Sequence, residues 1–177
     1  MKRAAVLGLA LTPLLSLLAA CGGDNGKDQV GQASPTPTAA TSACPAGAPT
    51  TDLSTKPSVV LPAGSTAPAD TTFTDVVVGK GAEAVDGSQV QVKYVGVLFD
   101  TCKEFDSSWS RGPAETLPFQ VGGQVIPGFS TGTKGMHVGG RRQVVIPAKD
   151  GYGAQGAGAD IPPNATLVFV IDLVKVS

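Results

Sequence analysis

Apolar and polar residues alternate along most of the chain after residue 72. Between positions 90 and 98, Val90, Val92 and Tyr94 fall on one face of an extended chain, while Gln91 and Lys93 fall on the other. A period of two residues is the pattern of a strand with one buried face. On this pattern, strands are predicted at 73–78, 90–98, 103–107, 117–121, 141–146 and 166–176.

One helix is predicted, from 127 to 136, with Pro127 at its start, where the missing N–H is tolerated. Gly128, Gly132 and Gly135 give this segment poor helical propensity, so packing must hold it in place. Antiparallel strands with a single short helix make an α+β fold. We expect a curled antiparallel sheet of about five strands wrapped around the helix, in one domain spanning 73–177.

The N-terminus has the layout of an export signal. Lys2 and Arg3 precede an apolar stretch that ends in small residues. A membrane-spanning helix is the alternative, but Pro13 interrupts the stretch, which is marginal against the roughly 20 apolar residues that a bilayer requires. The sequence Leu18-Ala19-Ala20-Cys21 resembles a bacterial lipobox, in which the leader is cut before a cysteine that becomes acylated.

Cys21 is therefore the predicted lipid anchor, since several acyl chains hold a protein firmly at a membrane. We expect 1–20 to be a lipoprotein signal peptide and the protein to be exported, on the extracytoplasmic side of a bacterial membrane. Residues 21–55 are rich in Pro, Thr, Ala and Gly and have few large apolar side chains, which predicts a flexible tether. An extended lead-in is predicted for 56–72.

Cys44 and Cys102 are left once Cys21 carries lipid. In an exported chain two remaining cysteines form a disulfide more often than they stay free, so this pairing is predicted. A metal site is the weaker alternative, because neither cysteine has CxxC spacing and the one histidine is distant. We expect no metal and no cofactor.

The charge pattern excludes some partners. The formal net charge is -1, and the sequence shows no basic patch that would favour nucleic acid. The usual catalytic patterns are also missing: there is a single histidine, no phosphate loop and no pair of neighbouring carboxylates. Because no residue pattern for proton-transfer catalysis is present, these patterns alone would indicate a binding module and not an enzyme.

Five segments, in order, carry a more specific signal. They are Val92-Lys93-Tyr94-Val95-Gly96, Phe105-Asp106-Ser107-Ser108, Val125-Ile126-Pro127-Gly128-Phe129, Met136-His137-Val138-Gly139-Gly140-Arg141-Arg142, and Tyr152-Gly153 followed by Ile161-Pro162-Pro163-Asn164-Ala165-Thr166-Leu167-Val168-Phe169. In this order and at this spacing the chain resembles the FKBP-type peptidyl-prolyl cis-trans isomerases. The resemblance implies an enzyme that rotates Xaa-Pro bonds in polypeptide substrates. The link from Tyr152 to Phe169 is too short for the domain that some relatives insert there. The long helical arm through which one branch of the family dimerises is missing too, so a monomer is expected.

The resemblance also assigns a site. Six residues match the family's catalytic pocket: Tyr94, Phe105, Asp106, Ile126, Tyr152 and Phe169. Five more are expected to bind substrate: Val125, Phe129, Leu117, Arg111 and Ile161. The resemblance implies that aromatic residues surround the proline ring. It also implies that the Tyr152 hydroxyl and the Ile126 amide bind substrate carbonyls. Asp106, paired with Arg111, would face the twisted bond.

Each of these residues could also have a purely structural role. Tyr94, Phe105 and Phe169 would be plain core in an unrelated domain, but here the pocket is the lining of that core. Asp106, followed by two serines, could form an Asx turn. Its place directly after Phe105 favours the pocket.

Some positions depart from the family pattern. Phe129 stands where well-known members place a tryptophan, and Leu117 replaces an aromatic wall. Ala157 and Asp160 make the rim less apolar. Proline binding should survive these changes, whereas tight binding of immunosuppressant macrolides is not expected. The leading hypothesis is an active isomerase that assists the folding of exported proteins. The alternatives are a membrane-tethered proline-peptide binding module with little catalysis, and a structural envelope lipoprotein.

Overall fold

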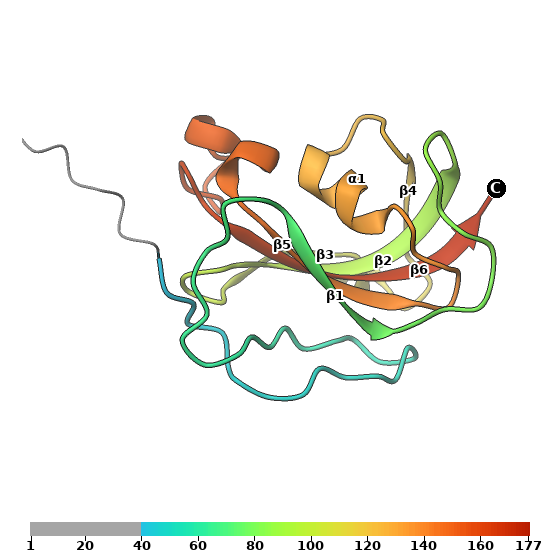
Figure 1. The fold of residues 1–177 in the computed structure, drawn as a ribbon, viewed down its shortest axis with the longest axis horizontal. Coiled ribbons are helices and arrows are strands. Elements are labelled where there is room, and N and C mark those ends of the chain that lie inside the picture. Colours follow the sequence, from blue (N-terminus) through green and yellow to red (C-terminus); the bar gives the residue numbers. More distant parts are fainter. Residues whose placement is uncertain (1–39) are drawn as a thin grey trace, which may run out of the picture. The chain divides into compact units, whose positions relative to one another are not determined.

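The computed structural model describes residues 40–177, so the predicted leader, Cys21 and the first part of the tether lie outside the described residues. One antiparallel sheet dominates this part of the chain (Figure 1). Its strands are β1 (Thr72–Val77), β2 (Gln89–Leu98), β3 (Glu104–Ser107), β4 (Leu117–Gln120), β5 (Arg141–Ile146) and β6 (Leu167–Val176). The α+β fold is confirmed, with six strands where about five were expected.

The strands follow the order β1-β5-β6-β2-β3, and β4 also pairs with β2. The long strand β2 has β3 along the later half of one edge and β4 along the earlier half of the same edge. Asp106 lies opposite Gly96, and Leu117 lies opposite Val92. This register brings β3 and β4 to one side of the molecule, where the site is found.

The helix α1 (Pro127–Thr133) crosses one face of the sheet and is shorter than the predicted 127–136 (Figure 1). It ends at Thr133. The capping residue Lys134 has a non-helical backbone, and Gly135 follows with a positive φ of 76°. A Cβ at Gly132 would lie 2.7 Å from Val144 on β5, and one at Gly128 would collide with Ile146. The glycines that lower the helical propensity are therefore those that let the helix approach the sheet closely.

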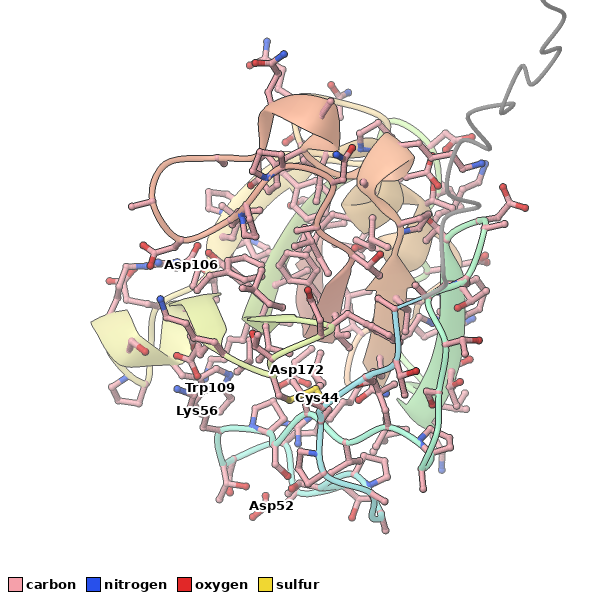
Figure 2. The ribbon with its side chains drawn as sticks, turned by 90° about the vertical axis from the view of Figure 1, so that its left-hand side faces the viewer. Cys44, Asp52, Lys56, Asp106, Trp109 and Asp172 are labelled. Carbon is pink, nitrogen blue, oxygen red and sulfur yellow. A yellow bond between two sulfur atoms is a disulfide. The ribbon has the colours of Figure 1, made fainter. Side chains whose placement is uncertain are left out.

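The opposite face of the sheet is covered by residues 40–71, called here the covering segment. In Figure 1 it runs beneath the sheet, on the side away from α1. Cys44, Val59 and Leu61 are buried in a second apolar cluster with the outer face of the sheet, including Val95 and Val170. The predicted disulfide between Cys44 and Cys102 is present and joins this segment to the turn between β2 and β3 (Figure 2).

The tether prediction for 21–55 is wrong for its last part, 40–55. The fully buried side chain of Arg141 donates hydrogen bonds to the main-chain carbonyls of Thr50, Asp52 and Thr55. Few large apolar residues occur here, which indicated flexibility, but backbone carbonyls and the buried Cys44 hold this stretch against the domain. Within residues 40–177, no helix is long and apolar enough to span a bilayer.

Candidate active site

A cavity of about 270 Å³ opens between α1, the inner face of the sheet and strand β3. Its walls are formed by Tyr94, Phe105, Asp106, Leu117, Gln124, Val125, Ile126, Phe129, Tyr152 and Phe169. All six residues predicted as catalytic are among them, together with three of the five predicted to bind substrate. Segments far apart in the sequence thus converge on one cavity.

The cavity is walled by aromatic rings that contact one another edge to face. Phe129 lies 5.0 Å from Phe169 and 5.8 Å from Tyr94 between ring centroids, with interplanar angles of 81° and 84°. Phe105 packs on Phe169 in the same manner at 5.5 Å. Such pairs stabilise each other beyond their burial, so the rings hold a fixed apolar surface.

Gly96 on β2 makes room for two of these rings. A Cβ at this position would lie 2.7 Å from both Phe105 and Phe169. Both rings therefore rest directly on the backbone of β2, which only glycine allows. This explains in physical terms why the segment that carries Tyr94 ends in glycine.

Three polar groups form a network on one wall. The Tyr94 hydroxyl donates to Asp106 Oδ2, and Arg111 Nη1 donates to Asp106 Oδ1 at 2.7 Å. Arg111 Nη2 also donates to the Tyr94 hydroxyl oxygen at 3.0 Å, and the Ser107 amide donates to Asp106 Oδ1 at 2.7 Å. The carboxylate is therefore fixed by three different donors.

This network sets the charge of its members. Burial disfavours the ionised form of Asp106, but the hydrogen bonds from Tyr94 and Arg111 outweigh it and hold the pKa of Asp106 below its ordinary value of 3.8. Burial, followed by the bond to Asp106, raises the pKa of Tyr94 above its ordinary value of 10.0. Asp106 is thus an anion and Tyr94 a neutral donor at neutral pH.

The two serines after Asp106 hold the backbone of Tyr94. The Tyr94 amide donates to Ser108 Oγ at 3.0 Å, and Ser107 Oγ donates to the Tyr94 carbonyl at 3.2 Å. Both serines are buried. The segment that sequence reasoning weighed as an Asx turn therefore locks the Tyr94 strand to the Asp106 strand.

Two predicted substrate-binding residues lie elsewhere. Ile161 is buried in the core and is not part of the cavity wall, because its main chain pairs with Ala157 and turns its side chain into the interior. Arg111 stands behind Asp106 and Tyr94 rather than in the wall. Conversely, Gln124 lines the cavity and was missed, since a polar residue after two glycines carries no distinctive signal.

No group of three or more metal-binding side chains occurs among residues 40–177. The cavity offers aromatic rings, one carboxylate, one exposed tyrosine hydroxyl and main-chain groups of the turn before α1. These can bind and orient an apolar ligand with carbonyl groups.

The chain was compared with known families and proteins. Residues 80–174 match the family model described as FKBP-type peptidyl-prolyl cis-trans isomerase. The chain is 50% identical over 120 residues to a protein of Corynebacterium glutamicum named probable FK506-binding protein, covering 68% of this chain and 98% of that protein. It is 51% identical over 123 residues to an FK506-binding protein of Streptomyces anulatus, covering 68% and 97%.

Solved structures give the same result. The crystal structure of AtFKBP13 is similar with a TM-score of 0.56 and 36% identity, over 63% of this chain and 96% of that one. The crystal structure of FkpA from Escherichia coli is similar with a TM-score of 0.55 and 42% identity, over 60% of this chain and 48% of that one.

Proposed function

Because the chain belongs to the family of FKBP-type peptidyl-prolyl cis-trans isomerases and is such an isomerase, we propose that it acts on exported proteins through the aromatic cavity. The observation that carries this proposal is the convergence of Tyr94, Phe105, Asp106, Tyr152 and Phe169 on that cavity. The substrate is a proline-containing segment of a polypeptide.

The reaction needs no proton transfer. Rotation of an Xaa-Pro bond has a barrier of about 18–20 kcal/mol, because the twisted amide loses its resonance. A protein lowers this barrier by binding the twisted form better than either planar form. The cavity suits this task because its aromatic walls exclude water around the proline ring.

We assign roles by position in the cavity. Phe105, Phe129 and Phe169 surround the proline ring. The Tyr152 hydroxyl and the Ile126 amide donate to substrate carbonyls on either side of the bond. Asp106 faces the twisted carbonyl, whose carbon becomes more positive as conjugation is lost, and its three donors keep it in place during the reaction.

We propose that catalysis takes place outside the cytoplasm, on a lipid-anchored monomer. Support comes from the leader pattern before Cys21 and from the Cys44–Cys102 disulfide, which fits an oxidising compartment. Slow prolyl steps of about 10–100 s limit the folding of many chains, and an anchored enzyme would meet those chains as they emerge. Phe129 and Leu117 in the wall support weaker binding of macrolides than of proline peptides.

Two experiments test the proposal. The full chain with Cys21→Ser should accelerate cis-trans exchange of a proline tetrapeptide in a protease-coupled assay. Turnover at the uncatalysed rate would leave only the binding-module function. In a bacterial host the native chain should fractionate with membranes and the Cys21→Ser variant should not; equal membrane association of both would refute the lipid anchor.

A further inference from the structure

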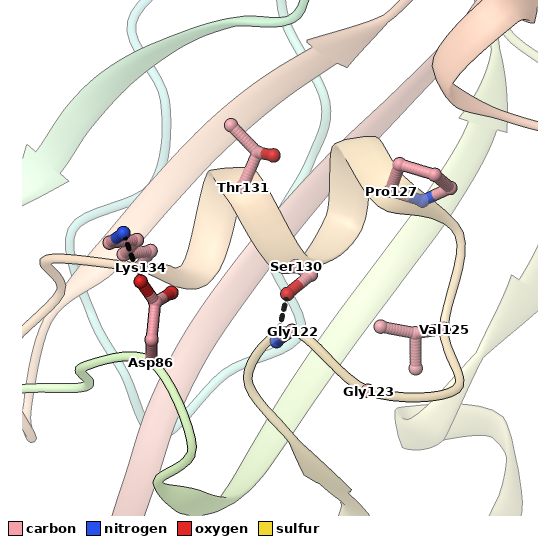
Figure 3. Close-up of a pocket in the computed structure, with 8 residues that line it drawn as sticks. All are labelled: Asp86, Gly122, Gly123, Val125, Pro127, Ser130, Thr131 and Lys134. Atoms are coloured by element: carbon pink, nitrogen blue, oxygen red, sulfur yellow. Dashed lines mark hydrogen bonds and ion pairs between the residues drawn. The ribbon is translucent and has the colours of Figure 1, made fainter.

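A second cavity, of about 400 Å³, lies beside the active-site cavity and is larger than it. Figure 3 shows the residues that line it, which come from three segments: the turn after β4, helix α1, and the connection between β1 and β2. They are Asp86, Gly122, Gly123, Val125, Pro127, Ser130, Thr131 and Lys134. Its volume falls within the roughly 300–1,000 Å³ of typical ligand sites. We call it the helix cleft.

The helix cleft and the active-site cavity share a wall. Val125 lines both, so the turn 122–125 separates them. A polypeptide whose proline occupies the active-site cavity and which passes over Val125 enters the helix cleft within a few residues. The two cavities therefore meet at Val125, and one polypeptide can occupy both.

The chemistry of the helix cleft suits an uncharged stretch of polypeptide. Lys134 and Asp86 form an ion pair with each other, so their charges compensate. Val125 and Pro127 offer apolar surface, and Thr131 adds an exposed hydroxyl. This composition gives no preference for an ion of either sign.

Ser130 supplies a buried polar group in the wall. It is 8% exposed, and its Oγ accepts a hydrogen bond of 2.6 Å from the Gly122 amide, which ties the turn to α1 (Figure 3). A serine hydroxyl can accept and donate at once. Among the described residues its hydrogen has no acceptor, and it is available to a peptide carbonyl in the cleft.

We propose that the helix cleft is a second binding site of the isomerase, which takes small uncharged residues of the substrate adjoining the proline. The inference rests on the proposed use of the active-site cavity, and it makes the enzyme selective for what flanks the proline as well as for the proline itself. Val125 then contacts the substrate in both sites.

The test compares a blocked proline tetrapeptide with the same peptide extended by four Ala and Ser residues, on its N-terminal side in one peptide and its C-terminal side in another. The protein is the full chain with Cys21→Ser. Affinity is measured by titration, and the amide signals of Gly122, Gly123 and Thr131 are followed by NMR. We expect one extended peptide to bind at least fivefold more tightly than the tetrapeptide, and only that peptide to shift these signals. Two aspartates in the extension should abolish the gain.

Thr131→Trp fills the helix cleft, and Thr51→Trp places the same side chain on the covering segment as a matched control. The affinity ratio of extended to short peptide should fall to within twofold of one in Thr131→Trp and stay unchanged in Thr51→Trp. Equal affinities for all peptides, or a ratio that persists in Thr131→Trp, would overturn the proposal. So would cleft signals that shift with protein concentration alone, which would indicate a second copy of the chain as occupant. The binding measurements test the second site. The proposed isomerase function is tested separately, because it would be contradicted if no peptide were turned over.

Discussion

Arg141 and Asp172 lie directly opposite each other on β5 and β6 and form a buried ion pair with two hydrogen bonds. Arg141 Nε is 2.5 Å from Asp172 Oδ1, and its Nη2 is 2.7 Å from Oδ2. The remaining N–H groups of the guanidinium bind carbonyls of the covering segment. One ion pair therefore connects the middle of the sheet to the chain that covers its outer face.

Removing one partner of this ion pair should lower the stability of the fold. Asp172→Asn leaves a buried guanidinium without its counter-charge, and we expect the free energy of unfolding to fall by about 3–5 kcal/mol. Urea denaturation measures this value. Lys103→Met is the control, because it removes an ion pair with Asp160 whose side chains are 62% exposed, and a loss of no more than about 1 kcal/mol is expected. Equal losses in the two variants would contradict this account.

The Cys44–Cys102 disulfide should stabilise the domain without acting on the reaction. It closes a loop between residues 58 positions apart, and its removal by the double change Cys44→Ser and Cys102→Ser should cost about 2–4 kcal/mol. Hydrogen exchange should speed up mainly in 40–71. Because the cavity lies on the other face of the sheet, turnover of a tetrapeptide at 15 °C should stay within twofold. A tenfold loss in a folded variant would show that the covering segment acts on the site.

Gly96→Ala should damage the site directly. The new Cβ would press on Phe105 and Phe169, so the aromatic walls must move apart and kcat/KM should fall at least tenfold. Gly47→Ala is the matched control, since its Cβ would meet only Val60 at an ordinary 3.8 Å. Circular dichroism should show both variants folded. Full activity of Gly96→Ala would mean that the ring positions do not matter to catalysis.

The pH dependence follows from the two shifted groups. The pKa of Asp106 is lowered in the folded state, so the unfolded chain binds more protons in acid and the stability from this carboxylate is lost as pH falls below 3.8. Tyr94 deprotonates only above 10.0. We therefore expect kcat/KM, measured by NMR exchange spectroscopy, to be constant from pH 5 to pH 8. A midpoint inside that range that disappears in Asp106→Asn would contradict the assignment of the network.

The sequence predicted most of the sheet because its strands show a clear period of two. The predicted 141–146 matches β5, the predicted 73–78 is shifted by one residue from β1, and the other four strands differ by one residue at one end. The helix was predicted too long. It ends at Thr133, before Gly135, but glycines also occur inside it, at Gly128 and Gly132. Nothing in a single sequence distinguishes a glycine that packs from one that terminates a helix.

The sequence predicted the positions of most site residues that stand in recognisable segments. It did not predict the positions that depend on tertiary contacts. Tyr94, Phe105 and Asp106 stand in recognisable segments and meet in the cavity. Gln124 has no such signature, and Ile161 lies in the core although its segment is recognisable. The packing of 40–55 was missed because it depends on a buried arginine some 90 residues later, which no local pattern reveals.

The central claim is that the cavity around Asp106 is the isomerase site, and replacing this carboxylate tests it most directly. In the full chain with Cys21→Ser, Asp106→Leu should lower kcat/KM for a proline tetrapeptide at least tenfold, with an unchanged fold by circular dichroism. Tyr152→Phe should lower it severalfold, since a substrate hydrogen bond is lost. Asp70→Leu, which replaces an exposed aspartate of the covering segment outside the cavity, should stay within twofold of the parent. If Asp106→Leu keeps the parent rate in a folded protein, the reaction takes place elsewhere and the assignment of the site is wrong.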